Sequence, residues 1–208
     1  MRIDKAIIYE ARGADPGKDR FVRESPSGRM VIVIAGDAAE IPDIARELAD
    51  QGVQLIELCG GLSPVWRPRV AAAAARGVRV SSITFGIESL QAAAAYNAAF
   101  LERRPPMEAA IFLEAGADPH RDRFAREFPP QNTTFVPVPD EATGAKVAAD
   151  LAGAGYGLIE LYGGFSTAGA ASVIEAVEGR APVGIGSFGL DATGWLAPPQ
   201  VARRPVAR

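Results

Sequence analysis

The sequence is poor in residues that form covalent or metal cross-links: its 208 residues include one cysteine, Cys59, and one histidine, His120. A single cysteine cannot form an intramolecular disulfide, and it cannot assemble a cysteine-based zinc site. We therefore expect a protein of a reducing compartment, whose fold depends on its apolar core. The core has ample material, since 48% of the residues are hydrophobic.

An excess of one charge and long apolar runs are also lacking. Lys and Arg number 22 and Asp and Glu 25, which gives a formal net charge of -3. The basic residues are scattered except near the C-terminus, so we expect no nucleic-acid partner. No apolar run approaches the roughly 20 residues that a membrane-spanning helix needs, so the sequence predicts a soluble, cytoplasmic protein with no membrane partner.

Nucleotide-binding and nucleophile motifs are missing as well: there is no G-x-G-x-x-G with an acid about 20 residues downstream, no Walker loop and no G-x-S-x-G elbow. We therefore expect no nucleotide cofactor. A metal could be held only by oxygen ligands such as Glu57 and Glu160, and although Mg²⁺ or Mn²⁺ would suit them, no motif indicates either ion.

What the sequence does contain is a tandem repeat. G-A-D-P occurs at residues 13–16 and again at 116–119, and L-I-E-L occurs at 55–58 and again at 158–161. Both pairs are displaced by 103 positions, and this offset aligns the two halves without a gap. The chain therefore contains two copies of one unit.

Each copy alternates strands with helices, which predicts the α/β class with a largely parallel sheet. In the first copy the expected strands are 5–11, 30–35, 53–59 and 78–85, and the expected helices are 38–50, 63–76 and 88–103. Asp15 as an N-cap before Pro16 also predicts a short helix through Glu24, with i,i+4 ion pairs on a solvated face. The second copy repeats this order, with Asp118 as the equivalent cap.

We divide the chain into two (βα)4 repeats, 1–104 and 105–191, and a Pro- and Arg-rich tail, 192–208, in which the last helix is truncated or absent. Eight βα units predict a small (β/α)8 barrel-like domain. The alternative is two open four-stranded parallel α/β lobes, related by a pseudo-twofold axis and separated by a cleft.

Glu57 and Glu160 are the leading site candidates because each interrupts an apolar strand expected to be buried. A buried carboxylate is costly unless it is paired. In a barrel the two strands lie opposite each other, so both acids would point into the mouth and act as a paired acid and base. The alternative is that each makes a local ion pair or accepts backbone amides.

A double glycine follows each of these strands and leads into a helix. Gly60, Gly61, Gly163 and Gly164 would expose backbone amides that bind an anion or oxyanion, and Ser63 and Ser166 follow them. Alternatively, the glycines only make short turns and the serines cap the helices. Thr84 and Ser187 end the fourth strands, so we expect their hydroxyls at the same mouth.

Positions at which the copies differ could recognise the two ends of an asymmetric substrate. Cys59, a candidate base or nucleophile, aligns with Tyr162, a candidate acid. Arg12 could hold a carboxylate or phosphate, and Trp66 could cover a ligand. Glu10 also differs from its counterpart. The alternatives are small-residue packing for the cysteine and an exposed loop for the arginine.

With its repeated G-A-D-P, D-R-F and L-I-E-L-[CY]-G-G motifs and a closing F-G-I-E, the chain resembles a functionally uncharacterised bacterial α/β domain family of about 100 residues, present here twice. The resemblance covers residues 5–103 and 107–191. It implies a small α/β domain found alone or in tandem, and it supplies no substrate or catalytic residue. Single-copy relatives would have to dimerise to bring two such edges together.

The leading hypothesis is a cofactor-independent acid–base enzyme, of the isomerase, epimerase, lyase or cyclase type, that acts on a small anionic organic metabolite. The alternative is a non-catalytic small-molecule or anion-binding protein with two equivalent sites. A scaffold whose strand acids make only structural pairs is a third reading, and a homodimer is left open. The expected partner is thus a small-molecule substrate.

Overall fold

The computed structural model describes residues 3–74 and 77–189. The expected tail at 192–208 and the truncated last helix lie outside the described residues. The strands of the first repeat are β1 (Lys5–Glu10), β2 (Arg20–Ser25), β3 (Gly28–Ala35), β4 (Leu55–Leu58) and β5 (Arg79–Phe85). Its helices are α1 (Ile41–Asp50), α2 (Arg67–Ala73) and α3 (Leu90–Leu101).

The second repeat follows the same plan. Its strands are β6 (Glu108–Leu113), β7 (Phe124–Phe128), β8 (Gln131–Val138), β9 (Leu158–Tyr162) and β10 (Val183–Ser187). Its described helices are α4 (Glu141–Gly153) and α5 (Thr167–Val177). Short 3-10 turns at Ala38–Glu40, Pro64–Trp66 and Ile87–Ser89 precede α1, α2 and α3. The mixed α/β class expected from the sequence is confirmed.

All ten described strands form one sheet, in the order β2-β3-β1-β4-β5-β10-β9-β6-β8-β7. The order is the same from either end when each strand is replaced by its equivalent in the other repeat. Strands β3, β1, β4 and β5 are parallel to one another, as are β8, β6, β9 and β10. Strands β5 and β10 pair antiparallel. The two repeats are therefore related by a pseudo-twofold axis between β5 and β10.

This arrangement differs from both expected architectures. A (β/α)8 barrel needs eight parallel strands, whereas this sheet has ten strands and contains antiparallel pairs at β2–β3, β5–β10 and β7–β8. The two halves are not separate lobes either, because β5 and β10 join them into one sheet. Two features account for the difference from both architectures. Each repeat carries an extra edge strand, and the repeats join through the antiparallel pair β5–β10.

The extra strands replace the helix expected from Asp15 to Glu24 and its counterpart. Instead of capping a helix, Asp15 accepts the amide of Gly17 within a turn, at 2.9 Å. The following residues Arg20–Ser25 pair antiparallel with β3. Phe21 and Val22 favour a strand, and the hairpin turns at Gly28, whose φ is +119°. The expected i,i+4 ion pairs are therefore wrong.

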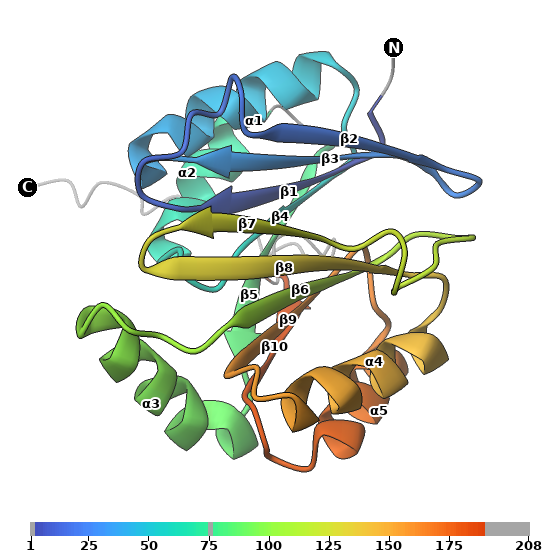
Figure 1. The fold of residues 1–208 in the computed structure, drawn as a ribbon. Coiled ribbons are helices and arrows are strands. Elements are labelled where there is room, and N and C mark those ends of the chain that lie inside the picture. Colours follow the sequence, from blue (N-terminus) through green and yellow to red (C-terminus); the bar gives the residue numbers. More distant parts are fainter. Residues whose placement is uncertain (1–2, 75–76, 190–208) are drawn as a thin grey trace, which may run out of the picture.

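The sheet is curled, with its concave face filled by both repeats and its convex face covered by helices. Helices α1 and α2 lie outside the first half and α4 and α5 outside the second (Figure 1). The interior cluster includes Ile7 and Ile32 of the first repeat and Phe112, Phe135 and Tyr162 of the second. One apolar core therefore spans the two copies, so the folding free energy depends on both.

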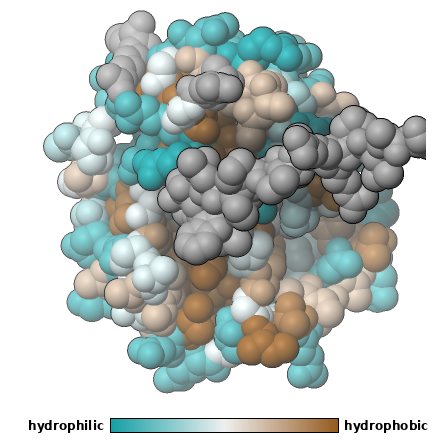
Figure 2. Space-filling model, turned by 180° about the vertical axis from the view of Figure 1, so that it is seen from behind, coloured by the Kyte–Doolittle hydropathy of each residue, from teal (hydrophilic) through white to brown (hydrophobic). Residues whose placement is uncertain are grey.

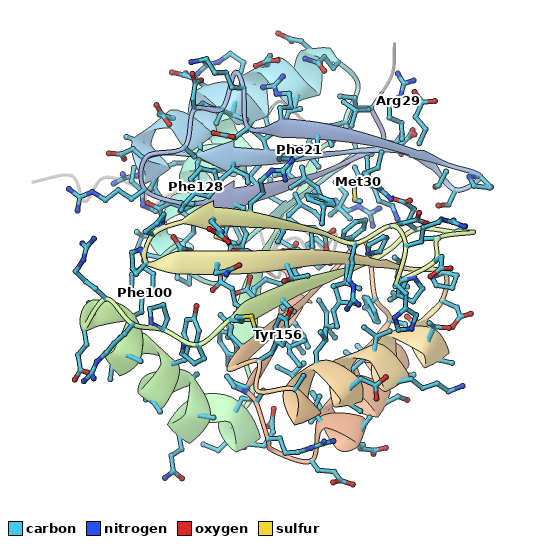
Figure 3. The ribbon with its side chains drawn as sticks, in the orientation of Figure 1. Phe21, Arg29, Met30, Phe100, Phe128 and Tyr156 are labelled. Carbon is cyan, nitrogen blue, oxygen red and sulfur yellow. The ribbon has the colours of Figure 1, made fainter. Side chains whose placement is uncertain are left out.

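The edge strands β2 and β7 approach each other through aromatic side chains. The ring centroids of Phe21 and Phe124 are 5.3 Å apart, and the Arg126 guanidinium lies 4.1 Å from the centroid of the Phe21 ring. Figure 3 shows Phe21 and Phe128 in the zone where the two halves face each other. These contacts complete the curl without backbone hydrogen bonds between the edges.

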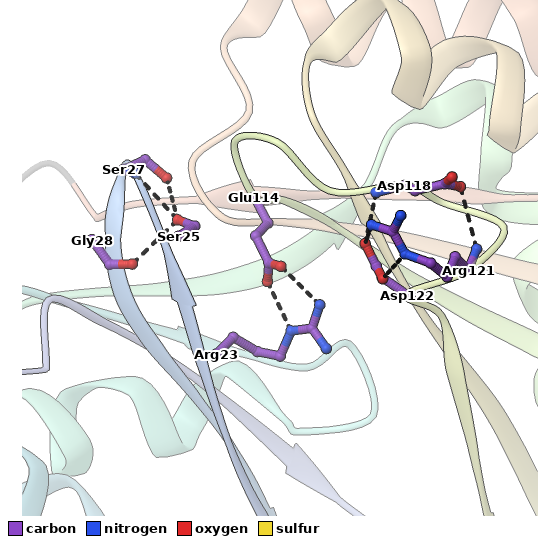
Figure 4. A network of polar contacts seen from close by, with 8 residues as sticks. All are labelled: Arg23, Ser25, Ser27, Gly28, Glu114, Asp118, Arg121 and Asp122. Carbon is purple, nitrogen blue, oxygen red and sulfur yellow. Dashed lines mark hydrogen bonds and ion pairs between the residues drawn. The ribbon is translucent and has the colours of Figure 1, made fainter.

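A salt bridge joins the repeats at the same seam. Arg23 of β2 donates through Nε and Nη2 to both carboxylate oxygens of Glu114, at 2.8 and 2.7 Å (Figure 4). The Glu114 side chain is only 10% exposed. Such a two-pronged bond fixes the relative position of the two segments.

The face seen from behind relative to Figure 1 mixes polar and apolar residues, and apolar residues gather in its lower part, on the side of α3 (Figure 2). Ile87, Leu90 and Leu101, in and next to α3, are among the exposed apolar side chains. Within the described part of the chain, no helix combines the length and the apolar character needed to cross a membrane.

Candidate functional site

The strand acids Glu57 and Glu160 are each held by the double-glycine turn of the other repeat. The amide of Gly163 donates to Glu57 at 2.7 Å, and the amide of Gly60 donates to Glu160 at 3.0 Å. These bonds cross the pseudo-twofold axis in both directions. The strand acids and the double glycines thus lie next to each other. Each turn, however, binds a carboxyl group of the protein where an external anion was expected.

Only glycine allows this approach at residue 60. A Cβ atom there would lie 2.3 Å from the Glu160 Oε1. At Gly163 the backbone φ of +83° adds a second requirement, since L side chains rarely adopt it. The recurring glycines therefore serve the contact between the repeats.

Burial raises the pKa of both acids to about 7. The main cause is the same for each, because a carboxylate loses hydration inside the protein. The amides of Gly163 and Gly60 oppose the shift. Both carboxyl groups can thus exchange a proton near neutral pH.

The surroundings of the two acids differ. Lys5 lowers the pKa of Glu57, and its Nζ donates to the Gly163 carbonyl at 2.8 Å. Glu160 instead has a second acid, Glu108, which raises its pKa, and it accepts a short hydrogen bond from the Tyr162 hydroxyl. Lys5 and Glu108 occupy equivalent positions in the two repeats. The two repeats therefore carry opposite charges at this position.

A pocket of about 390 Å³ lies beside Glu160 and beneath α3, and we call it the α3 pocket. Its lining residues come from both repeats and from α3. They are Tyr9, Glu10, Arg12, Cys59, Gly60, Gly61, Phe85, Ala93, Tyr96, Asn97, Phe100, Glu108, Gln131, Leu158 and Glu160. Its size falls within the range of small-molecule sites. Glu57 is not among the lining residues, so the two strand acids do not share this cavity.

Glu108 sits at the centre of a hydroxyl network in the pocket wall. Its carboxylate accepts short hydrogen bonds from Tyr9, Tyr96 and Thr133, which come from β1, α3 and β8. Burial is the main cause that raises the pKa of Tyr9 and Tyr96, and Glu108 adds to it. The network thus ties α3 to the sheet interior and keeps both phenols in the protonated form.

The predicted base or nucleophile, Cys59, and the predicted acid, Tyr162, both lie near Glu160. Cys59 lines the pocket, but burial raises the pKa of its thiol, which does not favour a thiolate. Tyr162 is fully buried, with its hydroxyl on Glu160 and its pKa raised by burial. Tyr162 is not among the residues that line the pocket.

Glu10 and Arg12, two positions at which the repeats differ, line the pocket. Arg12 is exposed and Glu10 half-buried, so both belong to the solvent side. Burial raises the pKa of Glu10. Gly61 also lines the pocket, whereas Gly164 lies in the other turn, near Lys5.

The remaining candidates lie outside this cavity. Ser63 and Ser166 accept the amides of Val65 and Gly169, which fits the helix-capping alternative. Trp66 packs under the guanidinium of Arg69, and Ser187 donates to the Ser82 carbonyl. Thr84, on β5, is half-buried and does not line the pocket.

Sequence reasoning missed Glu108 and the tyrosines around it. Glu108 begins an apolar strand, which is an ordinary place for a solvated acid. A signal was nevertheless present, because Glu108 aligns with Lys5, and positions at which the copies differ were already candidates for an asymmetric site. Tyr96 lies on α3, whose counterpart falls outside the described residues.

A metal centre has no evident ligand set in residues 3–74 and 77–189, since no three His, Cys, Asp or Glu side chains gather there to hold an ion.

Comparison with known proteins identifies the family. A protein-family model described as a family of unknown function (DUF6506) matches two consecutive segments, residues 4–98 and 99–194. Neither a curated protein nor a solved structure matches the chain. The two matches together span most of the sequence and follow the pseudo-twofold repeat seen in the sheet. The chain therefore belongs to this family of unknown function and carries its domain twice.

Proposed function

We propose that the protein is an acid–base enzyme without a nucleotide cofactor, of the isomerase, epimerase, lyase or cyclase type, with one active site in the α3 pocket. The observation that carries the proposal is that two buried carboxyl groups, Glu160 and Glu108, line one cavity of substrate size. Carboxyl pairs in such surroundings are typical of proton-transfer sites.

In this proposal Glu160 transfers the proton. Its pKa of about 7 lets it accept a proton from the substrate and return it at neutral pH. Tyr162 and Gly60 hold its two oxygens in place, while Glu108 raises its proton affinity. Arg12 at the solvent side supplies the binding group for the anionic end of the substrate. Glu57 belongs to the structural contact between the repeats.

The proposal can be tested before the substrate is known. The protein is incubated in D₂O with a panel of small amines, amino acids and carboxylic acids. Deuterium incorporation at the carbon atoms of each compound is followed by NMR. We expect exchange with at least one compound, and Glu160→Gln should slow it by about 100-fold or more. Glu57→Gln is the matched control, because it alters the equivalent acid outside the pocket, and it should retain exchange.

The opposite pattern would contradict the assignment: equal exchange in wild type and Glu160→Gln, or a loss confined to Glu57→Gln. No exchange with any compound would favour the binding-protein alternative. Its two equivalent sites are poorly supported, since Lys5 stands where Glu108 stands in the other copy and the α3 pocket has an asymmetric lining.

A further inference from the structure

The charged groups that line the α3 pocket are mostly acidic. Glu10, Glu108 and Glu160 contribute three carboxyl groups, and Arg12 contributes the single basic group of the lining. The acids at the inner end are almost fully buried, with Glu108 and Glu160 each 3% exposed. Arg12 is exposed. Because charges act more strongly where water is excluded, a cation beside the two inner acids favours their ionised forms and is attracted by them.

Hydrogen-bond donors are also scarce at the inner end. Tyr9 and Tyr96 both give their hydroxyl hydrogens to Glu108, so towards the cavity they can offer only oxygen lone pairs. The Gly60 amide is already bonded to Glu160. A ligand that reaches this end therefore meets acceptors and must itself supply donors.

The walls are aromatic. Phe85 and Phe100 add two phenyl rings to those of Tyr9 and Tyr96. Figure 3 shows Phe100 at the end of α3 that faces the sheet. Aromatic faces attract cations and pack against apolar groups. Carboxylates, spare acceptors and ring faces together match a protonated amine, which carries a positive charge and three donors.

We infer that the α3 pocket takes a small organic molecule with a protonated amine, whose ammonium group lies at Glu108 and Glu160 and whose apolar body lies against Phe85 and Phe100. The inference rests on the proposed function only in taking the pocket as the substrate site. It specifies that site further: the anionic end of the substrate is held at Arg12, and the buried end is cationic.

The test compares three probes of nearly equal shape, namely benzylamine, benzyl alcohol and benzoate, by calorimetry and by NMR titration of the full-length protein. We expect benzylamine to bind about 10-fold or more tightly than benzyl alcohol, since one buried charged hydrogen bond is worth that much. Benzoate should bind more weakly than either. Equal or tighter binding of the alcohol or of benzoate would overturn the inference.

Variants separate charge from shape. Glu108→Gln should lower the affinity for benzylamine by about 10-fold and leave that for benzyl alcohol within about twofold. Glu10→Gln, at the half-buried position away from the tyrosine network, should lower benzylamine affinity by a smaller factor and keeps the test open if Glu108→Gln does not fold. Glu57→Gln is the control and should bind both probes as wild type does. Unchanged amine preference in both pocket variants would contradict the inference.

The outcomes distinguish this inference from the proposed function. Selective amine binding without deuterium exchange supports the ligand class and contradicts the enzyme. Exchange only on compounds that lack an amine supports the enzyme and contradicts the ligand class.

Discussion

The two halves of the curled sheet share one structural contact and differ in almost everything around it. In each half a strand acid accepts the amide of the other repeat's double glycine, Glu57 from Gly163 and Glu160 from Gly60. In the first half the neighbour of the acid is Lys5, and in the second it is Glu108 in its tyrosine network. Only the second acid lines the α3 pocket.

The difference separates what holds the repeats together from what makes a site. Positions that are identical in the two copies, such as the strand acids and glycines, make the contact across the pseudo-twofold axis. Positions that differ, such as Tyr9 opposite Phe112 and Arg12 opposite Ala115, line the pocket in one copy only. Within this duplicated chain, the positions that differ thus indicate which of the two equivalent acids lies at a cavity.

The largest effect is expected from substitutions that break the two crossed contacts unequally. Gly163→Ala should lower the free energy of unfolding by about 3 kcal/mol, because its φ is +83° and the new Cβ would lie 2.7 Å from the Leu113 amide nitrogen. Gly60→Ala should cost about 1 kcal/mol, since its Cβ meets the movable end of Glu160.

Urea denaturation measures both losses, and the deuterium-exchange assay gives the complementary readout. We expect Gly60→Ala to abolish exchange although it is the more stable variant. Equal destabilisation by the two substitutions, or full deuterium exchange in Gly60→Ala, would show that the two crossed contacts do not differ in the way described.

A smaller effect is expected at the seam, where the two copies again differ. Arg23→Ala should lower the free energy of unfolding by about 2 kcal/mol, because it leaves the nearly buried Glu114 without its partner. Arg126→Ala, the equivalent change, removes a cation–π contact with Phe21 and should cost about 0.5–1 kcal/mol. Thermal and urea unfolding of both variants checks the ranking, and a larger loss in Arg126→Ala would reverse it.

Stability should also depend on pH through both strand acids. Burial raises both pKa values from 4.5 to about 7, so between these values the folded state keeps protons that the unfolded state releases. Stability should therefore fall as pH rises through this window, by about 1.4 kcal/mol per pH unit for each proton held. Glu57→Gln and Glu160→Gln should each remove one such contribution.

Urea denaturation of wild type and both variants at pH 5, 6, 7 and 8 gives these slopes. A wild-type slope in both single variants would show that neither acid keeps its proton in the folded state. A reduced slope in one variant alone would sharpen the comparison by identifying the acid that does.

Much of the fold could be predicted because the repeat offset and the apolar strands are local signals. The helix α3 and the strands that carry Glu57 and Glu160 lie where the sequence indicated. The Asp15-Pro16 signal could not show whether a helix or an edge strand follows, because the same two residues also favour turns. Pairing with β3 decided the outcome, and that is a long-range interaction.

The candidate site was predictable only in part for a similar reason. Glu160, Cys59, Gly60 and Arg12 follow from motifs or from differences between the copies, and all four line the pocket. That Glu160 would face Glu108, with Glu57 elsewhere, depends on which strand ends the curled sheet brings together. No spacing within one repeat contains that information.

The crossed glycine–carboxyl bonds also have a consequence for how such a chain can change over time. Once two copies are fused, each carries the acceptor for the other's turn, so a recombination event that deletes either copy leaves a buried carboxyl group without its amide donor unless a second chain supplies one. Duplication is therefore easier than reversion. Both copies are needed for the crossed bonds, whereas a position outside those bonds, such as Glu108 opposite Lys5 in the alignment, can differ between the copies.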